Sequence, residues 1–305
     1  MPQERPRTIC CVVLFVSMVL SAIPGACFSD IDFKTALLVS QKIKPYIHVV
    51  DGITDEIAAT TTQMDVFFLS PSNDQESRQL NRQIVLQLEG GPYDLVTAIG
   101  PEAASALWDS KAGFKKMYAA VLDPDSLPAL SSHACGISLR IPAQTQLEKI
   151  SQTFQTIKKI GLIFDPGHNQ WFYDQALLAA TNIGLEIIAL SVNSKNQIAG
   201  VLKDNMGAMD AVWMIPDPTV ISEKIIHYVI KQGLYNKRGV IGYNSFFTRS
   251  GAFFSFEFDY RALGRQAGQE MNIYLETGEC RQAPPVFNTI VNEKIADKIG
   301  IRVTQ

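Results

Sequence analysis

The stretch from Lys159 to Ser194 constrains the fold of this chain more than any other. IGLIFD at 160–165 is a short apolar run that ends in Asp-Pro-Gly, and LEIIALSV at 185–192 is a second apolar run. Between them, apolar residues recur at helical spacing, with Asn169 as the expected N-cap and Gly184 at the expected C-terminal cap. Two buried strands joined by a crossover helix run parallel with a right-handed connection. The stretch therefore predicts an α/β fold with a parallel sheet.

The same alternation of strand and helix occurs on both sides of this unit. Before it, we expect strands at 35–40, 64–70, 93–100 and 115–123, with helices at 45–59, 75–89 and 101–109. After it, we expect strands at 210–217 and 239–244, with helices at 195–206 and 219–232. Repeated βα units of this kind are the pattern of doubly wound sheets. Two such series predict two α/β lobes.

The C-terminal part is expected to pass back and forth between the lobes. It contains a strand and a helix within 252–279, then another strand and a short helix within 284–303. We therefore predict two doubly wound parallel-sheet lobes joined by a three-strand hinge. The crossings are expected near 136–140, 246–252 and 280–286. Lobe one is expected to comprise 33–136 plus 252–279, and lobe two 137–251 plus 280–305.

Residues 1–26 are typical of a signal peptide. Arg5 and Arg7 precede an unbroken apolar run at 9–23, and small residues follow it. We expect cleavage after Ala26. A lipoprotein processed at Cys27 and an uncleaved membrane anchor, for which the run is short, are the alternatives. The mature protein is expected in the periplasm or on the extracytoplasmic face of the membrane.

Beyond Cys27 the sequence has two further cysteines, Cys135 and Cys280. An oxidising compartment would permit a disulfide between them, but we expect two buried free thiols. No Cys/His spacing suits a metal site. The formal net charge of −3 and the pI near 5.8 give no electrostatic reason to expect a nucleic-acid partner.

The sequence offers little support for catalysis or for a cofactor. It has no GxSxG, no Walker loop and no GxGxxG after a strand. Asp165 and His168 could form an acid–base pair, but a capped turn beside an exposed histidine is the favoured interpretation. We therefore expect a protein that is not an enzyme and that needs no cofactor.

A ligand cleft is expected where strands end, because doubly wound sheets bind ligands beyond the carboxyl ends of their strands. Aromatic side chains at these ends provide walls, although any of them could equally be core, and free N–H groups at helix starts could meet a negative group. A ligand ammonium would favour a carboxylate there, although turn capping alone explains Asp before Pro. The candidates on lobe one are Ser40, Gln41, Tyr46, Ser72, Gly100, Pro101 and Glu102. The candidates on lobe two are Asp165, Asn169, Trp171, Asp217, Asn244 and Phe246, and Tyr243 is a further aromatic residue placed to line a crevice.

Seven stretches in order carry a resemblance to a known family. They are YDLVTAIGPEAASAL (93–107), AAVLDP (119–124), GISLRIPAQTQLEKI (136–150), KIGLIFDPGHNQ (159–170), DAVWMIPDPTV (210–220), FEFDYRALGRQAGQEMNIYLETGE (256–279) and PPVFNTIVNEKIADKIGI (284–301). Together they resemble the substrate-binding proteins of ABC transporters, in the group related to tryptophan- and tyrosine-binding proteins. The family often has Asn-Ser where this chain has Asn169-Gln170, so the hydroxyl that could hold an amino-acid carboxylate is missing here.

The resemblance implies a type I periplasmic-binding fold and a monomer that binds a small molecule, such as an amino acid or an aromatic solute. It also implies delivery of that ligand to an ABC permease in the inner membrane. The alternative is a ligand-sensing module for an envelope receptor or signalling kinase, without transport.

Overall fold

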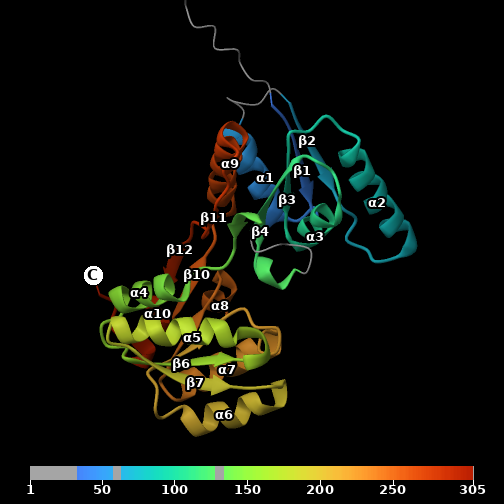
Figure 1. Cartoon of the computed structure of the whole chain (residues 1–305). Helices are drawn as coiled ribbons and strands as arrows, with labels where there is room; N and C mark the ends of the chain where they lie inside the picture. The colour runs from blue at the N-terminus through green and yellow to red at the C-terminus, as the bar shows by residue number, and fades with distance from the viewer. Residues whose placement is uncertain (1–32, 58–62, 128–133, 305) are drawn as a thin grey trace, which may run out of the picture. The chain divides into compact units, whose positions relative to one another are not determined.

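The computed structural model describes residues 33–57, 63–127 and 134–304 of the chain. The predicted signal peptide and Cys27 lie outside these residues. Two six-stranded sheets organise the described chain, and each carries helices on both faces (Figure 1). Within the described ranges, no helix combines the length and the apolar character needed to cross a membrane. The prediction of two parallel-sheet α/β lobes is confirmed.

The first sheet is parallel throughout, with strand order β11-β5-β4-β3-β1-β2. Its strand β1 (Lys34–Val39) is apolar on both faces, as expected for a strand covered on each side by helices. Leu37 and Val39 enter one core, and Ala36 and Leu38 enter the other. The remaining strands are β2 (Gln63–Phe68), β3 (Leu95–Ile99), β4 (Lys115–Val121), β5 (Cys135–Ser138) and β11 (Gln282–Ala283).

Among the described residues, four α-helices belong to this first lobe. Helices α1 (Lys44–Ile57) and α9 (Tyr260–Thr277) cover one face of the sheet, and α3 (Pro101–Asp109) covers the other. Helix α2 (Gln75–Glu89) has the predicted bounds, but only one of its apolar residues is buried. Leu88 lies in the core, whereas Leu80 is 49% exposed.

Helices α1 and α9 approach each other so closely that glycine is needed at the contact. A Cβ atom built on Gly264 would collide with the carbonyl oxygen of Val49, and one on Gly52 would collide with the carbonyl oxygen of Arg261. The two backbones therefore lie in direct contact, and α9 is fixed on the first lobe although it is coded far from α1.

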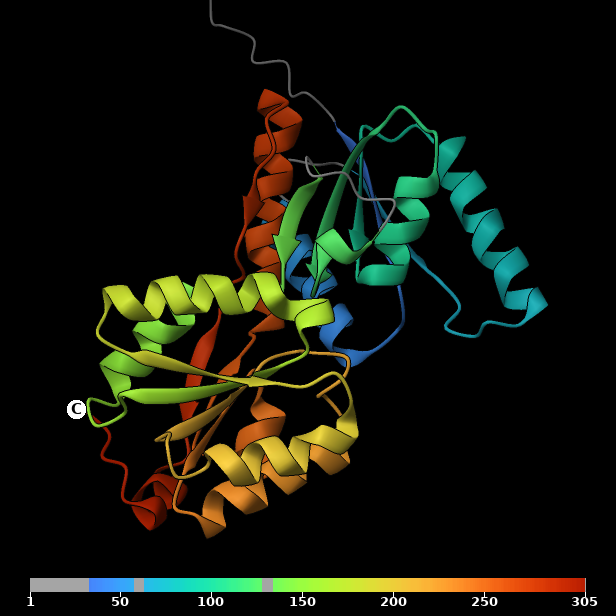
Figure 2. The ribbon, with the colours of Figure 1, turned by 60° about the horizontal axis from the view of Figure 1, so that its bottom comes forward.

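The second sheet has strand order β12-β10-β9-β8-β6-β7, with every neighbouring pair parallel except β10 and β12. Its strands are β6 (Lys159–Phe164), β7 (Glu186–Ser191), β8 (Ala211–Met214), β9 (Gly239–Gly242), β10 (Phe254–Glu257) and β12 (Asn288–Val291). Figure 2 shows helices on both faces of this sheet. Helices α4 (Ala143–Thr153) and α5 (Pro166–Asn182) bury one face, and α6 (Ile198–Asn205) and α7 (Glu223–Tyr235) bury the other.

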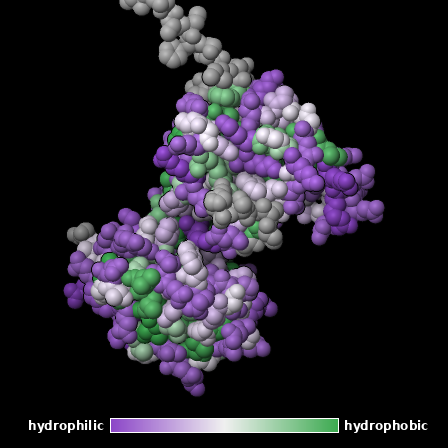
Figure 3. All heavy atoms as spheres, viewed as in Figure 1, coloured by the Kyte–Doolittle hydropathy of each residue, from purple (hydrophilic) through white to green (hydrophobic). Residues whose placement is uncertain are grey.

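Helix α5 begins earlier than the sequence predicts. Its N-cap is Asp165, whose carboxylate accepts a hydrogen bond from the Gly167 N–H at 2.9 Å, and Pro166 takes the first helical position. Asn169, the expected N-cap, instead kinks the helix after its first turn with φ −129° and ψ 23°. Farther along, Leu178 of α5 is 63% exposed, and apolar residues colour part of this lobe's visible face in Figure 3.

The chain crosses between the two sheets three times. The crossings lie at 139–142, 258–259 and 284–287. The second one is later than the predicted 246–252, because 245–249 form helix α8 (Ser245–Arg249) and β10 stays in the second sheet. Phe254 of β10 packs its ring 5.3 Å from that of Phe154 in the second core. Hence β10 belongs to the second sheet, although the sequence predicts all of 252–279 in lobe one.

The prediction of two free thiols is wrong: Cys135 and Cys280 form a disulfide, with their Cα atoms 5.5 Å apart. The cause is the short strand β11, which pairs with β5 so that Gln282 lies opposite Gly136. This register brings Cys280 beside Cys135 across a sequence separation of 145 residues. The last helix, α10 (Glu293–Ile299), follows β12 and packs in the second lobe.

Candidate functional site

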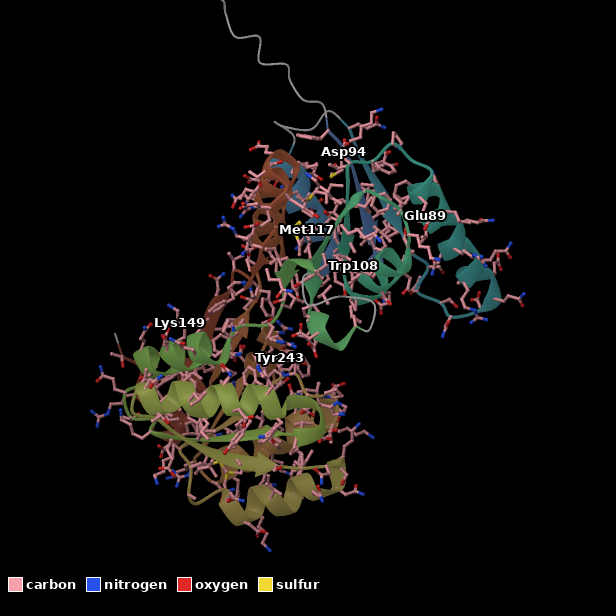
Figure 4. All side chains as sticks on the ribbon, in the orientation of Figure 1. Glu89, Asp94, Trp108, Met117, Lys149 and Tyr243 are labelled. Atoms are coloured by element: carbon pink, nitrogen blue, oxygen red, sulfur yellow. A yellow bond between two sulfur atoms is a disulfide. The ribbon has the colours of Figure 1, made fainter. Side chains whose placement is uncertain are left out.

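A cavity of about 620 Å³ lies where three groups of elements meet. This volume falls in the range of small-molecule sites. The loop after β4 contributes Leu122, Asp123 and Asp125 to its lining. The first crossing and α4 contribute Leu139, Arg140, Ile141 and Gln146, and the second crossing contributes Phe258. The loops after β6, β8 and β9, with the start of α5, contribute Gly167, His168, Asn169, Trp171, Phe172, Ile215, Pro216, Pro218 and Tyr243, the last of these labelled in Figure 4.

Arg140 is the centre of the polar contacts in this cavity. Its Nη1 donates to Asp125 Oδ2 at 2.7 Å, and its Nη2 is paired with Asp123. The guanidinium carbon also lies 5.4 Å from the centre of the Trp171 ring, which places a cation over an aromatic face. Burial lowers the pKa of Arg140, but an arginine remains protonated in proteins. One side chain thus links the loop after β4, the first crossing and α5.

Beneath the cavity, two aspartates hold the ends of β6 and β8 together. The Asp217 carboxylate accepts from the Asp165 N–H and from Asn169 Nδ2, both at 2.8 Å. The Thr219 hydroxyl donates to Asp165 at 2.6 Å, and this bond, with one from the Gly167 N–H, lowers the pKa of Asp165. Both carboxylates are therefore engaged in the turns, as the capping interpretation of the two Asp-Pro pairs predicts.

A second polar cluster lies at the carboxyl ends of β1 and β3 in the first lobe. Ser40 Oγ accepts from the Ala103 N–H at 2.9 Å, which fixes the start of α3. Gly100 has φ 89°, and a Cβ atom there would lie 2.7 Å from Ser40 Oγ and 2.8 Å from the Tyr46 hydroxyl. Burial, followed by the nearby Glu102 carboxylate, raises the pKa of Tyr46 to about 12, so its phenol remains a neutral hydrogen-bonding group.

The thirteen predicted residues thus fall into separate groups. Asn169 and Trp171 line the cavity, and Asp165 and Asp217 lie beneath it. Ser40, Tyr46, Gly100 and Glu102 form the first-lobe cluster, together with Pro101 at the start of α3 and the neighbouring half-buried Gln41.

The other three predicted residues have structural contacts of their own. The Ser72 hydroxyl bonds Asp74, the N-cap of α2. Asn244 caps α8 by accepting from the Phe246 N–H at 3.0 Å, and the Phe246 ring lies 5.9 Å from that of His227. No described contact brings these residues to the cavity.

Sequence reasoning missed Asp123, Asp125 and Arg140. A signal was present for Asp123, because it follows the fourth strand at its carboxyl end, the same position that identified Asp165 after the strand at 160–165. Arg140 lies in a crossing segment, where no strand-end rule applies. Its only signal was that it is the one charged residue in the stretch GISLRI.

The two parallel-sheet lobes, the three crossings and the cavity beside them define a class: two-lobed binding proteins of the type I periplasmic fold. The family model for ABC transporter substrate binding proteins matches residues 42–305. The chain therefore belongs to this family, as its resemblance predicted.

Solved structures support the fold. The chain is 22% identical to the ABC domain in complex with L-Trp from Streptococcus pneumonia, covering 90% of this chain and 96% of that one with a TM-score of 0.59. It is 20% identical to a ligand-free, open substrate binding protein with adhesive properties from Clostridium difficile, covering 88% and 95% with a TM-score of 0.72. A periplasmic ribose ABC transporter structure from Conexibacter woesei is 12% identical, covering 88% and 95% with a TM-score of 0.57. No curated protein sequence matches this chain.

Proposed function

We propose that this protein is an exported, monomeric solute-binding protein that captures a small molecule with a flat apolar body and delivers it to an ABC permease. The observation that carries the proposal is the cavity, which combines apolar and aromatic walls with a few polar side chains. Trp171 supplies a broad face at 58% exposure, and Tyr243 and Phe258 supply further aromatic surface. The Streptococcus pneumonia relative in complex with L-Trp supports an amino acid or another aromatic solute as the ligand.

In this proposal the ligand binds first to the cavity and then meets the first-lobe cluster. Ser40, Tyr46 and Gly100 lie at strand ends of the first sheet, where such sheets bind ligands. Bending of the three crossings would bring these groups onto the ligand, and contacts with both lobes would stabilise the closed state. The protein binds and releases its ligand without changing it.

Export is part of the proposal. The basic residues and apolar run at 1–26 support a signal peptide, with processing after Ala26 and with lipidation at Cys27 as the alternative. The disulfide between Cys135 and Cys280 supports an oxidising compartment, because such bonds persist outside the cytoplasm.

The proposal is tested by native mass spectrometry of protein purified without denaturation, followed by calorimetry with the ligand that it identifies. We expect one small aromatic molecule to be retained at a ratio of one per chain. Export is checked by sequencing the N-terminus of the mature protein, which is expected to start at Cys27. A chain that starts at Met1, or that retains no solute under these conditions, would contradict the proposal.

A further inference from the structure

The cavity lining carries more negative than positive charge. Among the described residues that line it, Asp123 and Asp125 are carboxylates, and Arg140 is the one lysine or arginine side chain. Both carboxylates bond the same guanidinium, each through a different nitrogen. One cation against two anions leaves a formal net charge of −1 on these three side chains. A ligand entering the cavity therefore meets a negative potential, which salt screens because both carboxylates are partly exposed.

The exposure of these three side chains decides which charge a ligand can reach. The Arg140 side chain is 28% exposed, whereas those of Asp123 and Asp125 are 44% and 67% exposed. The guanidinium is thus the inner partner, held by both acids and covered on one side by the Trp171 ring. A ligand carboxylate could bind Arg140 only by displacing one of the two aspartates. The other aspartate would then repel it.

The floor of the cavity adds to the same potential. The Gly167 N–H and Asn169 Nδ2, both on lining residues, are bonded to the carboxylates of Asp165 and Asp217. Asp217 accepts four hydrogen bonds in all, two on each carboxylate oxygen. These two donors are therefore already occupied and are not free to stabilise a ligand anion.

The aromatic walls are suited to a cation as well. The guanidinium of Arg140 lies over the Trp171 ring, so this face already accepts a positive charge. Tyr243 and Phe258 provide further ring surface in the same cavity. Aromatic faces attract ammonium groups and repel carboxylates because of the ring quadrupole.

We propose that Asp123 and Asp125 determine the charge of the ligand that the cavity accepts. The cavity binds a flat apolar molecule that carries a positively charged amine, and it rejects a molecule of the same shape that carries a net negative charge. Arg140 positions the two carboxylates at the cavity wall. The inference rests on the proposed function and specifies the ligand class of that site.

The test compares two indole probes that differ in the charge at the end of a two-carbon chain. Tryptamine carries an ammonium, and indole-3-propionate carries a carboxylate. Calorimetry at pH 7 and low salt should give tryptamine at least a tenfold tighter Kd. The double variant Asp123→Asn/Asp125→Asn should shrink this ratio at least tenfold or invert it, because Arg140 then lacks its counter-ions. Asp204→Asn, which removes one negative charge from the exposed side of α6 as each single Asp variant does from the cavity, should leave the ratio unchanged.

Arg140→Gln gives an independent check, since loss of the cation should widen the preference for tryptamine. Circular dichroism melts establish that each variant is folded, and the single Asp variants replace the double one if it does not fold. Equal or tighter binding of indole-3-propionate, or a ratio unaffected by the double variant, overturns the inference. If native mass spectrometry finds a retained solute but neither indole binds, the proposed ligand class is wrong and the proposed solute binding is supported. If no solute is retained and neither indole binds, both proposals are wrong.

Discussion

Trp171 and its neighbour Phe172 have different roles although they are adjacent on α5. Trp171 is 58% exposed and faces Arg140, whereas Phe172 is 7% exposed and packs its ring 5.4 Å from that of Trp213 in the second core. Adjacent positions on a helix point in different directions, so Trp171 extends along the cavity wall, whereas Phe172, which also lines the cavity, packs mainly in the second core. The pair allows the contributions of an exposed and a buried ring to folding to be compared.

Replacing Trp171 with alanine should weaken ligand binding about tenfold or more. Stacking on a ring contributes about 0.5–1.5 kcal/mol beyond burial, and 1.4 kcal/mol corresponds to a factor of ten. The thermal melt without ligand should change little, because the side chain is more than half exposed. Calorimetry with the retained ligand and a melt of the free protein measure both effects.

Phe172→Ala is the matched control and should destabilise the fold by about 3–5 kcal/mol, since it removes a large buried side chain. If Trp171→Ala instead lowers the melting temperature as much as Phe172→Ala and leaves affinity unchanged, Trp171 is a core residue.

Single residues were predictable where a rule of position applied. The rule that ligands bind beyond strand ends identified Asn169 and Trp171, and it brought Ser40, Tyr46 and Gly100 together. It could not find Arg140, because a crossing segment has no strand end. It also gave no sign that Asp217 is linked to the end of β6, since two of its four donors, the Asp165 N–H and Asn169 Nδ2, lie 52 and 48 residues away in sequence.

At the scale of elements, the contact between α1 and α9 holds the first lobe together. The two helices are separated by about two hundred residues of sequence, and glycines let their backbones touch. Such a contact tolerates no added side chain, because the obstacle is a carbonyl oxygen and not the end of a flexible side chain. The helix pair is thus a sensitive point for stability.

Gly264→Ala should destabilise the protein by about 1–3 kcal/mol, the range for overpacking of a tight contact. Gly200→Ala is the matched control: this helical glycine of α6 has open space around its Cβ position, and alanine there should stabilise by about 0.5–1 kcal/mol. Chemical unfolding of both variants measures the difference. Equal effects of the two changes would show that α1 and α9 can move apart at little cost.

Local patterns predicted most elements, because apolar periodicity separates strands from helices. The bounds of α2 and α3 agree with the prediction, and both series of parallel strands are present. The sheet to which β10 belongs was not predictable from its own four residues. It is set by the packing of Phe254 and Phe256 in the second core.

At the scale of the whole molecule, the disulfide between Cys135 and Cys280 closes a long loop. The sequence did not reveal this pairing, because the bond depends on β11, a strand of two residues with no apolar pattern. The closed loop spans a separation of 145 residues and includes the second lobe up to β10. Cross-linking such a loop restricts the unfolded chain far more than the folded one.

Replacing both cysteines with alanine should therefore lower stability by about 3–5 kcal/mol. Because the bond lies within the first sheet, the ligand affinity of the folded variant should stay near that of the native protein. Thermal melts with and without reductant measure the effect. Reductant should lower the melting temperature of the native protein and leave the double variant unchanged; a native protein indifferent to reductant would count against a structural disulfide.

The order of the strands also sets the order in which the chain can fold. Strand β11 forms one edge of the first sheet, and α9 covers one of its faces together with α1. Both β11 and α9 follow β10 of the second lobe in the sequence. When the segment from α4 to β10 has been synthesised, the first sheet still lacks its last strand and one helix, and the second sheet still lacks β12 and α10. Both sheets are therefore completed only by residues near the end of the chain, and each has an exposed edge until those residues are made.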